Sequence, residues 1–382
     1  MDKIIYLDNS ATTKPCDGCI KNINEALTVN WANPSSLYYM GLNAEKCVTS
    51  ARKTIAKILN SEENEIYFTS CGSESNNTAI FSGVNKNLKR GDTVITSVAE
   101  HPSVLKCFEE LEKQGLNVIR LPLNKQGVAD LSKLEGNLNK NVIFVSLMMV
   151  NNEIGSINNI KAAADLVHKN CPFALFHTDS VQAFCKMDIN VKKLGVDMLS
   201  FSGHKVHASK GIGGLYINRN IHIKPYIFGG GQERGFRSGT EAVPLIWGLK
   251  GALDEIGNVG ENLGYIQKLN DYTVNKLASL PFVTINSPEN ALPYIINFSV
   301  EGIRSETMLH FLEERNIFVS SGSACAKGES SYVLRALGVN KNTADSAIRI
   351  SFSRFNTTND IDILYNALGD AYLRLAKKRT IK

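Results

Sequence analysis

Residues 174–179 read Ala-Leu-Phe-His-Thr-Asp, and residues 198–205 read Met-Leu-Ser-Phe-Ser-Gly-His-Lys. Each stretch is an apolar run of strand length, typical of a buried strand, that leads into polar side chains. Helix-period stretches such as 75–87, 102–114 and 160–169 lie between most runs of this kind. The further runs that predict strands are 65–70, 93–97, 117–121, 142–147 and 214–217. This alternation predicts an α/β fold with a mainly parallel seven-stranded sheet covered by helices.

The pattern changes after residue 257. A helical stretch at 261–280 is followed by shorter strand runs and by a final helix from residue 358. The strand runs lie near 295–300, 317–320 and 348–351. We therefore expect two domains. They are a large domain, 15–257, and a small α/β domain formed by 1–14 with 258–382.

Composition narrows the class of protein. The chain has 382 residues, of which 43% are hydrophobic and 21% charged, as in globular proteins with a large core. Lys plus Arg is 42 and Asp plus Glu is 37, so the net charge of +5 predicts neither a nucleic-acid nor a membrane partner. The first residues do not have the pattern of a signal peptide, and eight cysteines are too few for a disulfide scaffold. We expect a cytoplasmic protein with free thiols.

A turn with a glycine follows the strand predicted at 65–70. It reads Cys71-Gly72-Ser73-Glu74-Ser75-Asn76-Asn77 and opens a predicted helix. Free backbone N–H groups at a helix start suit a phosphate, although an ordinary helix cap would also explain this sequence. Neither of the glycine-rich signatures of nucleoside triphosphate or dinucleotide sites is present.

Two chemically distinct residues follow the two runs quoted first. Asp179 comes after one strand, with Gln182 three residues on, and Lys205 comes shortly after the other. In an open parallel sheet, ligands bind at the carboxyl ends of the strands. A lysine that forms a Schiff base and a carboxylate beside the ring nitrogen are what pyridoxal phosphate requires. A helix cap and a surface lysine are the ordinary alternatives for Asp179 and Lys205.

Four further residues fit such a site. His101 and Asn152 follow other predicted strands and would stack on or hydrogen-bond a ring. Cys325 lies in a small, polar, glycine-containing loop, where an accessible thiol can be reactive. Arg349 interrupts an apolar strand, and a buried guanidinium suits a carboxylate.

At this point the sequence resembles the cysteine desulfurases, pyridoxal-phosphate enzymes of the class V aminotransferase group, in the branch of nitrogenase and iron–sulfur assembly. The likeness runs nearly end to end. The motifs that carry it are Tyr6-Leu7-Asp8-Asn9-Ser10-Ala11-Thr12-Thr13, Asn33-Pro34-Ser35-Ser36, Val150-Asn151-Asn152-Glu153-Ile154-Gly155, Ser200-Phe201-Ser202-Gly203-His204-Lys205, Arg237-Ser238-Gly239-Thr240, Ser321-Gly322-Ser323-Ala324-Cys325 and Val333-Leu334-Arg335-Ala336-Leu337-Gly338.

The resemblance implies a role for each matched residue. Lys205 would hold pyridoxal phosphate and move the Cα proton of the substrate, and Cys325 would take the sulfur of L-cysteine as a persulfide, leaving alanine. Asn152 and Arg349 would bind the substrate carboxylate. The residues that would bind the cofactor are Gly72, Ser73, His101, Asn152, Asp179, Gln182, Ser202, His204, Lys205 and, from the second subunit of a homodimer, Thr240. The sulfur would pass to an acceptor protein whose identity the sequence does not name.

Alternatives remain open at this level. The same cofactor would serve a selenocysteine lyase or another class V aminotransferase, and a sulfur-trafficking scaffold without catalysis is a third reading. The sequence departs from the family at Tyr38, at Cys71, at Ala208-Ser209 and in a shorter segment after Cys325. The single C-x-x-C of Cys16 and Cys19 lacks two further ligands nearby, so we predict no metal site.

Overall fold

The computed structural model describes residues 3–321 and 331–376. Its largest element is a seven-stranded sheet in the order β2-β8-β7-β6-β5-β3-β4. Only β8 runs antiparallel to its neighbours, β7 and β2, so the predicted mainly parallel sheet is confirmed. The strands are β2 (Ile66–Thr69), β3 (Thr93–Ser97), β4 (Asn117–Leu121), β5 (Val142–Ser146), β6 (Leu175–Asp179), β7 (Met198–Ser202) and β8 (Gly213–Ile217).

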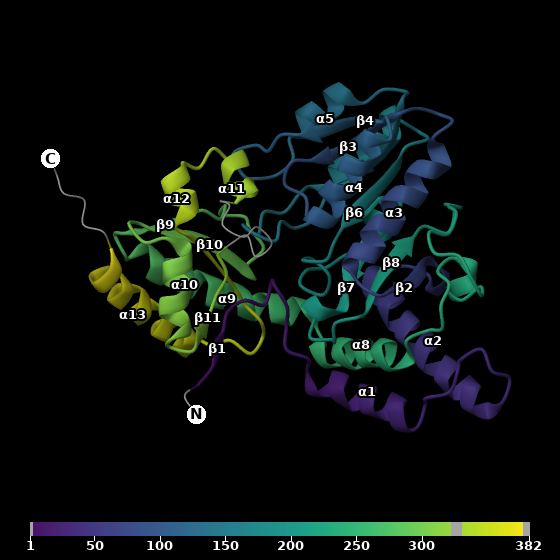
Figure 1. Cartoon of the computed structure of the whole chain (residues 1–382), viewed down its shortest axis with the longest axis horizontal. Coiled ribbons are helices and arrows are strands. Elements are labelled where there is room, and N and C mark those ends of the chain that lie inside the picture. Colours follow the sequence, from purple (N-terminus) through teal and green to yellow (C-terminus); the bar gives the residue numbers. More distant parts are fainter. Residues whose placement is uncertain (1–2, 322–330, 377–382) are drawn as a thin grey trace.

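Helices cover both faces of this sheet (Figure 1). On one face, α3 (Gly72–Asn87) and α4 (Pro102–Lys113) bury Ile80 and Phe108 against Phe144 and Met198. The other face packs against α6 and α8, with α1 lying along α8. The remaining helices of this part are α1 (Asp17–Thr28), α2 (Tyr39–Leu59), η1 (Glu63–Glu65), α5 (Leu131–Asn137), α6 (Ile160–Asn170), α7 (Val191–Leu194), η2 (Gly203–Lys205), η3 (Glu233–Gly235) and α8 (Val243–Ile256).

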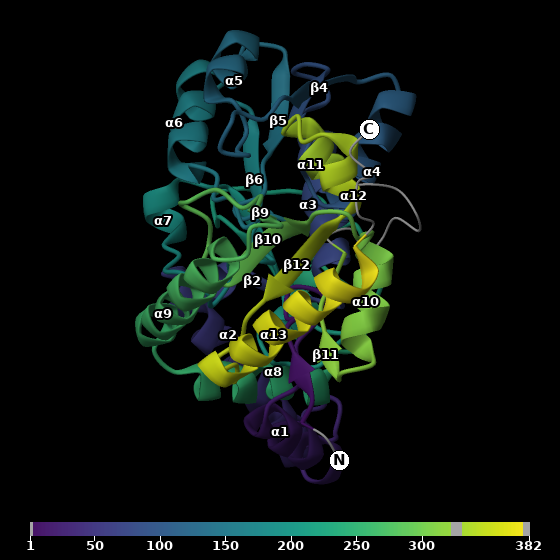
Figure 2. The same ribbon diagram turned by 90° about the vertical axis from the view of Figure 1, so that its left-hand side faces the viewer.

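The C-terminal part forms a second, smaller sheet with its own helices. An antiparallel sheet in the order β12-β10-β9 packs against α13, which lies in front of it in Figure 2. The stacked rings of Phe282 and Tyr372 join α13 to the segment before β9. Its elements are α9 (Val259–Ala278), β9 (Val283–Ile285), β10 (Ile295–Val300), α10 (Ser305–Glu313), β11 (Ile317–Phe318), α11 (Tyr332–Ala336), α12 (Lys341–Asp345), β12 (Ala347–Ser351) and α13 (Thr358–Leu375).

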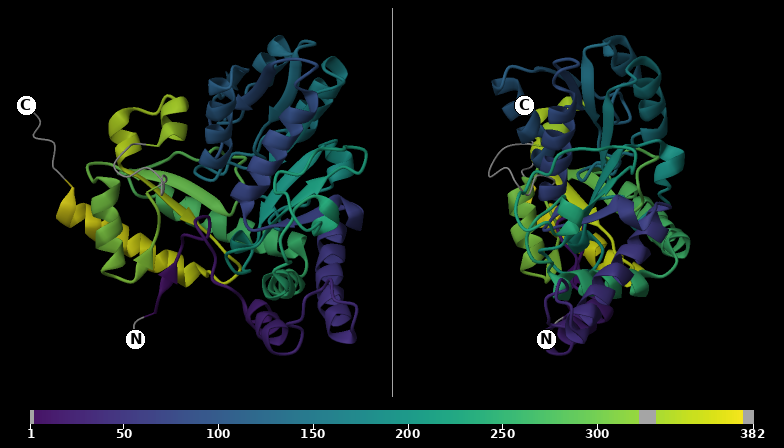
Figure 3. Two further views of the ribbon diagram at one scale, coloured as in Figure 1. Left: turned by 45° about the vertical axis from the view of Figure 1, so that its right-hand side comes forward. Right: turned by 90° about the vertical axis from the view of Figure 1, so that its right-hand side faces the viewer.

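The N-terminal segment joins the two parts (Figure 3). Strand β1 (Ile5–Tyr6) pairs in parallel with β11, and Asp8 forms a bridge to Ser351 at the end of β12. The chain then crosses to the large sheet, where the N–H of Thr13 donates to the carbonyl of His204 at 2.9 Å. The crossing segment is thereby held at the carboxyl ends of the central strands. The expected division into domains at residues 14 and 257 stays a prediction.

In the described parts of the chain, no helix combines the length and the apolar character needed to cross a membrane.

Candidate active site

A cavity of about 290 Å³ opens at the carboxyl ends of the central strands, beside the crossing N-terminal segment. Ten of the residues singled out from the sequence line it: Gly72, Ser73, His101, Asn152, Asp179, Gln182, Ser202, His204, Lys205 and Arg349. Thr240 is exposed and does not line the cavity. Cys325 lies outside the described residues.

Lys205 comes directly after β7, at the end of the short helix η2. Its Nζ donates to the carbonyls of Ser10 and Ala11, each at 2.6 Å. The crossing segment therefore supplies the polar contacts that hold this amine inside the cavity. Because both partners are backbone carbonyls, they orient the amine without adding a charge beside it.

Asp179 ends β6 at the floor of the cavity and is only 5% exposed. Its Oδ1 accepts from the N–H of Val181 at 2.9 Å, and its Oδ2 accepts from Nδ2 of Asn76 at 2.7 Å. Two neutral donors thus fix the plane of the carboxylate.

The start of α3 forms one wall of the cavity. A Cβ atom on Gly72 would lie 2.8 Å from Cγ2 of Val181, so only glycine fits at this point of the backbone. Ser202 faces the same place from β7, and its buried Oγ has no partner among the residues that the structure describes. An unpartnered buried hydroxyl is costly, and it identifies a place where a ligand can accept a hydrogen bond.

Arg349 and Asn152 form the wall toward the smaller sheet. Nη2 of Arg349 lies 2.7 Å from Oδ1 of Asp8, and Nη1 donates to the carbonyl of Asn152 at 2.8 Å. Within residues 3–321 and 331–376, Nε of Arg349 and Oδ1 of Asn152 are buried without a partner. The guanidinium is therefore oriented by the protein and keeps hydrogen-bonding capacity for a ligand.

Several residues of the cavity were missed by the sequence reasoning. Ser10, Cys71, Asn76 and Ser103 all line it. Cys71 and Asn76 were quoted only as part of the turn that opens a helix and Ser10 only within a family motif, whereas Ser103 lies two residues after His101. Lys186 lies behind the wall, fully buried, and donates to Oε1 of Gln182 at 3.2 Å. Burial, with the charges of Lys205 and Arg349 adding to it, lowers the pKa of Lys186 to about 7.

Two buried carboxyls lie next to catalytic candidates along the chain. Burial raises the pKa of Glu100, beside His101, to about 8, and the charge of Asp179 acts in the same direction. Burial raises the pKa of Glu153, beside Asn152, to about 7. Glu100 accepts from Ser97 Oγ at 2.6 Å and from the N–H of Met148 at 3.0 Å, so it ties the ends of β3 and β5 together.

We expect Glu100→Gln to flatten the dependence of stability on pH. Because the folded state raises the pKa of Glu100, its contribution is full below about pH 4.5 and is lost as pH rises through about 8. From pH 5 to pH 8 the variant should therefore gain about 3–4 kcal/mol relative to the unaltered protein, at about 1.4 kcal/mol per pH unit. Urea unfolding at the two pH values measures this, with the exposed Glu135→Gln as control. Equal pH slopes for Glu100→Gln and the unaltered protein would refute the assignment.

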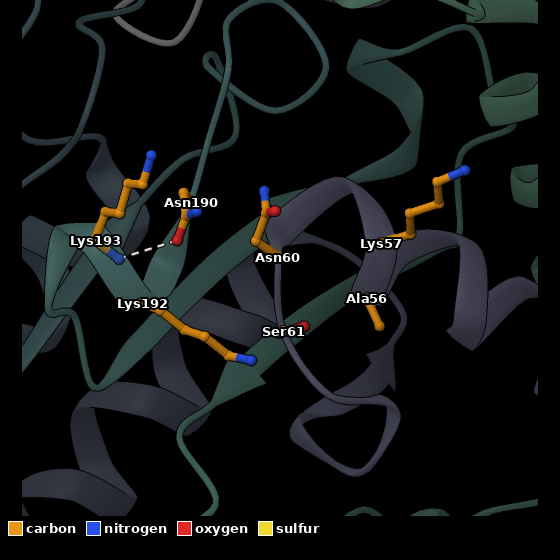
Figure 4. Close-up of a pocket in the computed structure, with 7 residues that line it drawn as sticks. All are labelled: Ala56, Lys57, Asn60, Ser61, Asn190, Lys192 and Lys193. Carbon is orange, nitrogen blue, oxygen red and sulfur yellow. Dashed lines mark hydrogen bonds between the residues drawn. The ribbon is translucent and has the colours of Figure 1, made fainter.

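A second hollow lies between the end of α2 and α7 and contains none of the predicted site residues (Figure 4). Lys57, Lys192 and Lys193 contribute amines to its rim, and the close-up shows them pointing in different directions. Because these three amines do not converge on one point, we assign the candidate active site to the cavity around Lys205 and not to this hollow.

Comparison with known proteins agrees with this geometry. The family model described as Aminotransferase class-V matches residues 5–364. A protein named Cysteine desulfurase IscS from Clostridium botulinum is 39% identical over 375 residues, which cover 96% of this chain and 94% of that protein. A solved structure titled "NIFS-LIKE PROTEIN" is 34% identical with a TM-score of 0.92, covering 97% of this chain and 100% of that one. Another, "SspA in complex with cysteine", is 33% identical with a TM-score of 0.82 and covers 92% and 100%.

These similarities extend over nearly the whole chain and include both sheets. The chain belongs to the class V aminotransferase family and, within it, to the cysteine desulfurases. The family and the enzyme class predicted from the sequence are thereby confirmed. The roles of individual residues stay predictions.

Proposed function

We propose that this chain uses pyridoxal phosphate to convert L-cysteine to L-alanine and transfers the sulfur to Cys325 as a persulfide. The observation that carries the proposal is the convergence of Asp179 from β6, Ser202 and Lys205 from the end of β7 and η2, and Arg349 from β12 on one cavity. One related structure is titled as a complex with cysteine, which supports the same substrate here.

The residues present fit the cofactor. The unpartnered Ser202 Oγ and the close backbone at Gly72 suit a phosphate at the start of α3. Asp179, which contacts Asn76 of α3, would pair with the ring nitrogen. The Lys205 amine would bind the cofactor covalently. Burial lowers the pKa of His204 to about 4 in the protein alone, and the negative charge of a bound phosphate would act in the opposite direction. The other predicted cofactor-binding residues are Ser73, His101, Asn152, Gln182 and, from a second subunit, Thr240.

Pyridoxal phosphate supplies an electron sink that stabilises negative charge at the Cα of a bound amino acid. The residues of this chain bind the substrate, move the protons and accept the sulfur. Lys205 moves the proton at Cα, and Arg349 with Asn152 holds the substrate carboxylate so that the Cα–H bond faces that amine. The Cys325 thiolate then forms an S–S bond with the substrate sulfur as the Cβ–S bond breaks. The electron pair of that bond stays on Cβ, which takes up a proton and becomes the methyl group of alanine.

Ser331 and Tyr332, at the start of α11, contact the cavity wall. Ser331, which caps α11, donates to the carboxyl of Glu153, and the Tyr332 hydroxyl donates to the carbonyl of Glu100 at 2.6 Å. These bonds join α11 to the turns that carry His101 and Asn152. Ser331, six positions after Cys325 in the chain, thus contacts the cavity wall, and this supports the proposed role of Cys325.

We further propose a homodimer. Large apolar side chains are exposed between α1 and α2, among them Trp31 at 63% and Leu37 at 103%, and such a surface is typical of a subunit interface. The exposed position of Thr240, outside the cavity of its own chain, is compatible with a contact to the partner's cofactor. Sedimentation velocity tests this, and a monomer at micromolar concentration would contradict it.

We place the enzyme in the cytoplasm, with an acceptor protein that collects the sulfur. Each of the seven cysteines in the described residues is a free thiol, which suits a reducing compartment. Free thiols are also expected in an enzyme that transfers sulfur through a single reactive cysteine.

The proposed activity is tested with the purified holoenzyme and three substrate sets. L-Cysteine with a reductant should give alanine and sulfide in equal amounts, whereas L-alanine with a keto acid should give no amino transfer. L-Selenocysteine is the third. A rate with L-selenocysteine far above that with L-cysteine would favour a selenocysteine lyase. A protein that binds pyridoxal phosphate but gives no product with any set would contradict catalysis and favour a trafficking scaffold.

A further inference from the structure

A chain of hydrogen bonds runs from Asp179 to His101 through two residues without an assigned role. Asn76 Nδ2 lies 2.7 Å from Asp179 Oδ2 and 2.9 Å from Ser103 Oγ. Ser103 Oγ lies 2.8 Å from His101 Nδ1, and the backbone N–H of Ser103 donates to the same nitrogen at 3.1 Å. Four residues from β6, α3 and the start of α4 are linked in this way.

The chain begins at an acceptor, which fixes the orientation of the Asn76 amide. A carboxylate only accepts hydrogen bonds, so the –NH₂ group of Asn76 must face Asp179. The opposite orientation would bring Oδ1 of Asn76 against Oδ2 of Asp179. One N–H of Asn76 is therefore donated to Asp179 and the other to Ser103.

The proton positions at His101 follow from this orientation. Because Ser103 Oγ accepts from Asn76, its own hydrogen is available to donate to His101 Nδ1. The backbone N–H of Ser103 also donates to Nδ1, which requires a lone pair there. Two independent donors thus exclude a proton on Nδ1. The proton of the neutral ring is on Nε2, which makes no hydrogen bond within the described part of the chain.

We infer that Ser103 and Asn76 are positioning residues that hold His101 as the neutral tautomer protonated on Nε2. In this form His101 presents a hydrogen-bond donor at its free nitrogen and is unable to remove a proton from the substrate through Nδ1. The inference rests on the proposed function. Within that function, Lys205 accepts the Cα proton, and His101 acts as a hydrogen-bond donor.

The charged surroundings of the ring are consistent with this. Burial lowers the pKa of His101, with Asp179 opposing the change and Lys205 reinforcing it. His204, on which the charge of His101 also acts, has its own pKa lowered to about 4, mainly by burial. The hydrogen bonds from Ser103 add to the penalty for the imidazolium, because a proton on Nδ1 would break both.

The test is ¹⁵N NMR of the holoenzyme labelled at histidine, without substrate, so it does not depend on turnover. The His101 signals are assigned by their absence in His101→Asn. We expect a protonated Nε2 and an unprotonated Nδ1 in the unaltered protein. In Ser103→Ala the pKa of His101 should rise by about 0.5–1, corresponding to the loss of one hydrogen bond, and Asn76→Ala should move it in the same direction.

Two controls separate positioning from general damage. Ser103→Thr keeps the hydroxyl and should restore the signals. Ser132→Ala alters a serine at the same place in α5, where its N–H donates to the capping Asp130 at 2.9 Å, and should leave His101 unchanged. A proton on Nδ1 in the unaltered protein, or an unchanged His101 pKa in Ser103→Ala, would overturn the inference. A holoenzyme that fails to desulfurate L-cysteine would overturn the proposed function and leave these signals as predicted.

Discussion

Lys205→Ala is expected to lower the rate of alanine formation from L-cysteine by about 10³-fold or more, the effect of losing a positioned acid–base group. The reason is geometric. Lys205 Nζ is held inside the cavity by the carbonyls of Ser10 and Ala11, and the structure offers no second amine on the cavity lining to replace it within the described residues. The initial rate with added pyridoxal phosphate measures the loss.

The matched control is Lys210→Ala, five residues along the same loop, whose side chain is exposed. It should keep the rate of the unaltered enzyme. Dialysis gives a second readout, because Lys205→Ala should release its cofactor and Lys210→Ala should retain it. A rate within tenfold of the unaltered enzyme in Lys205→Ala would show that another group moves the proton.

Cys325→Ala has the second large expected effect. Without this thiol, the substrate sulfur has no nucleophile to accept it, and we expect turnover with L-cysteine to fall by at least about 10²–10³-fold. Cofactor binding should be unchanged, since the residues that would hold the cofactor, among them Lys205, Asp179 and Ser202, are retained. Absorbance of the bound cofactor and the rate of alanine release are measured on the same sample.

Cys71→Ala is the control for this prediction. Cys71 lines the cavity at the start of α3, and no other cysteine in residues 3–321 and 331–376 does so. If Cys71 were the sulfur-accepting thiol, Cys71→Ala would lose turnover and Cys325→Ala would keep it. The proposal predicts the reverse.

The main sheet could be predicted from the sequence because its strands are buried on both faces. The residues of β5, β6 and β7 are all buried, so each strand begins with or consists largely of apolar residues and was recognisable from the sequence. Strand β9 was missed because its three residues are half-buried or exposed and give no such run. Asp179 is the last residue of β6 and does not follow it, a shift of one position that leaves it at the same edge of the sheet.

The candidate site was predictable to the extent that its residues follow strands. Asn76 was included in the motif after β2 but was interpreted as part of a helix cap, whereas its amide contacts Asp179, 103 positions away in the chain. The ion pair between Asp8 and Arg349 joins positions 341 apart. The first contact depends on how α3 packs on the sheet and the second on how the crossing N-terminal segment packs, and neither spacing nor periodicity encodes that.

The central claim is that Cys325 receives the sulfur of L-cysteine, and one measurement tests it most directly. The holoenzyme is mixed with one equivalent of L-cysteine that carries a heavy sulfur isotope, the free thiols are blocked, and the peptides are mapped by mass spectrometry. The account predicts the heavy sulfur on the peptide that contains Cys325, in an amount equal to the alanine released. Heavy sulfur on the Cys71 peptide, or alanine released with no sulfur bound to the protein, would contradict it.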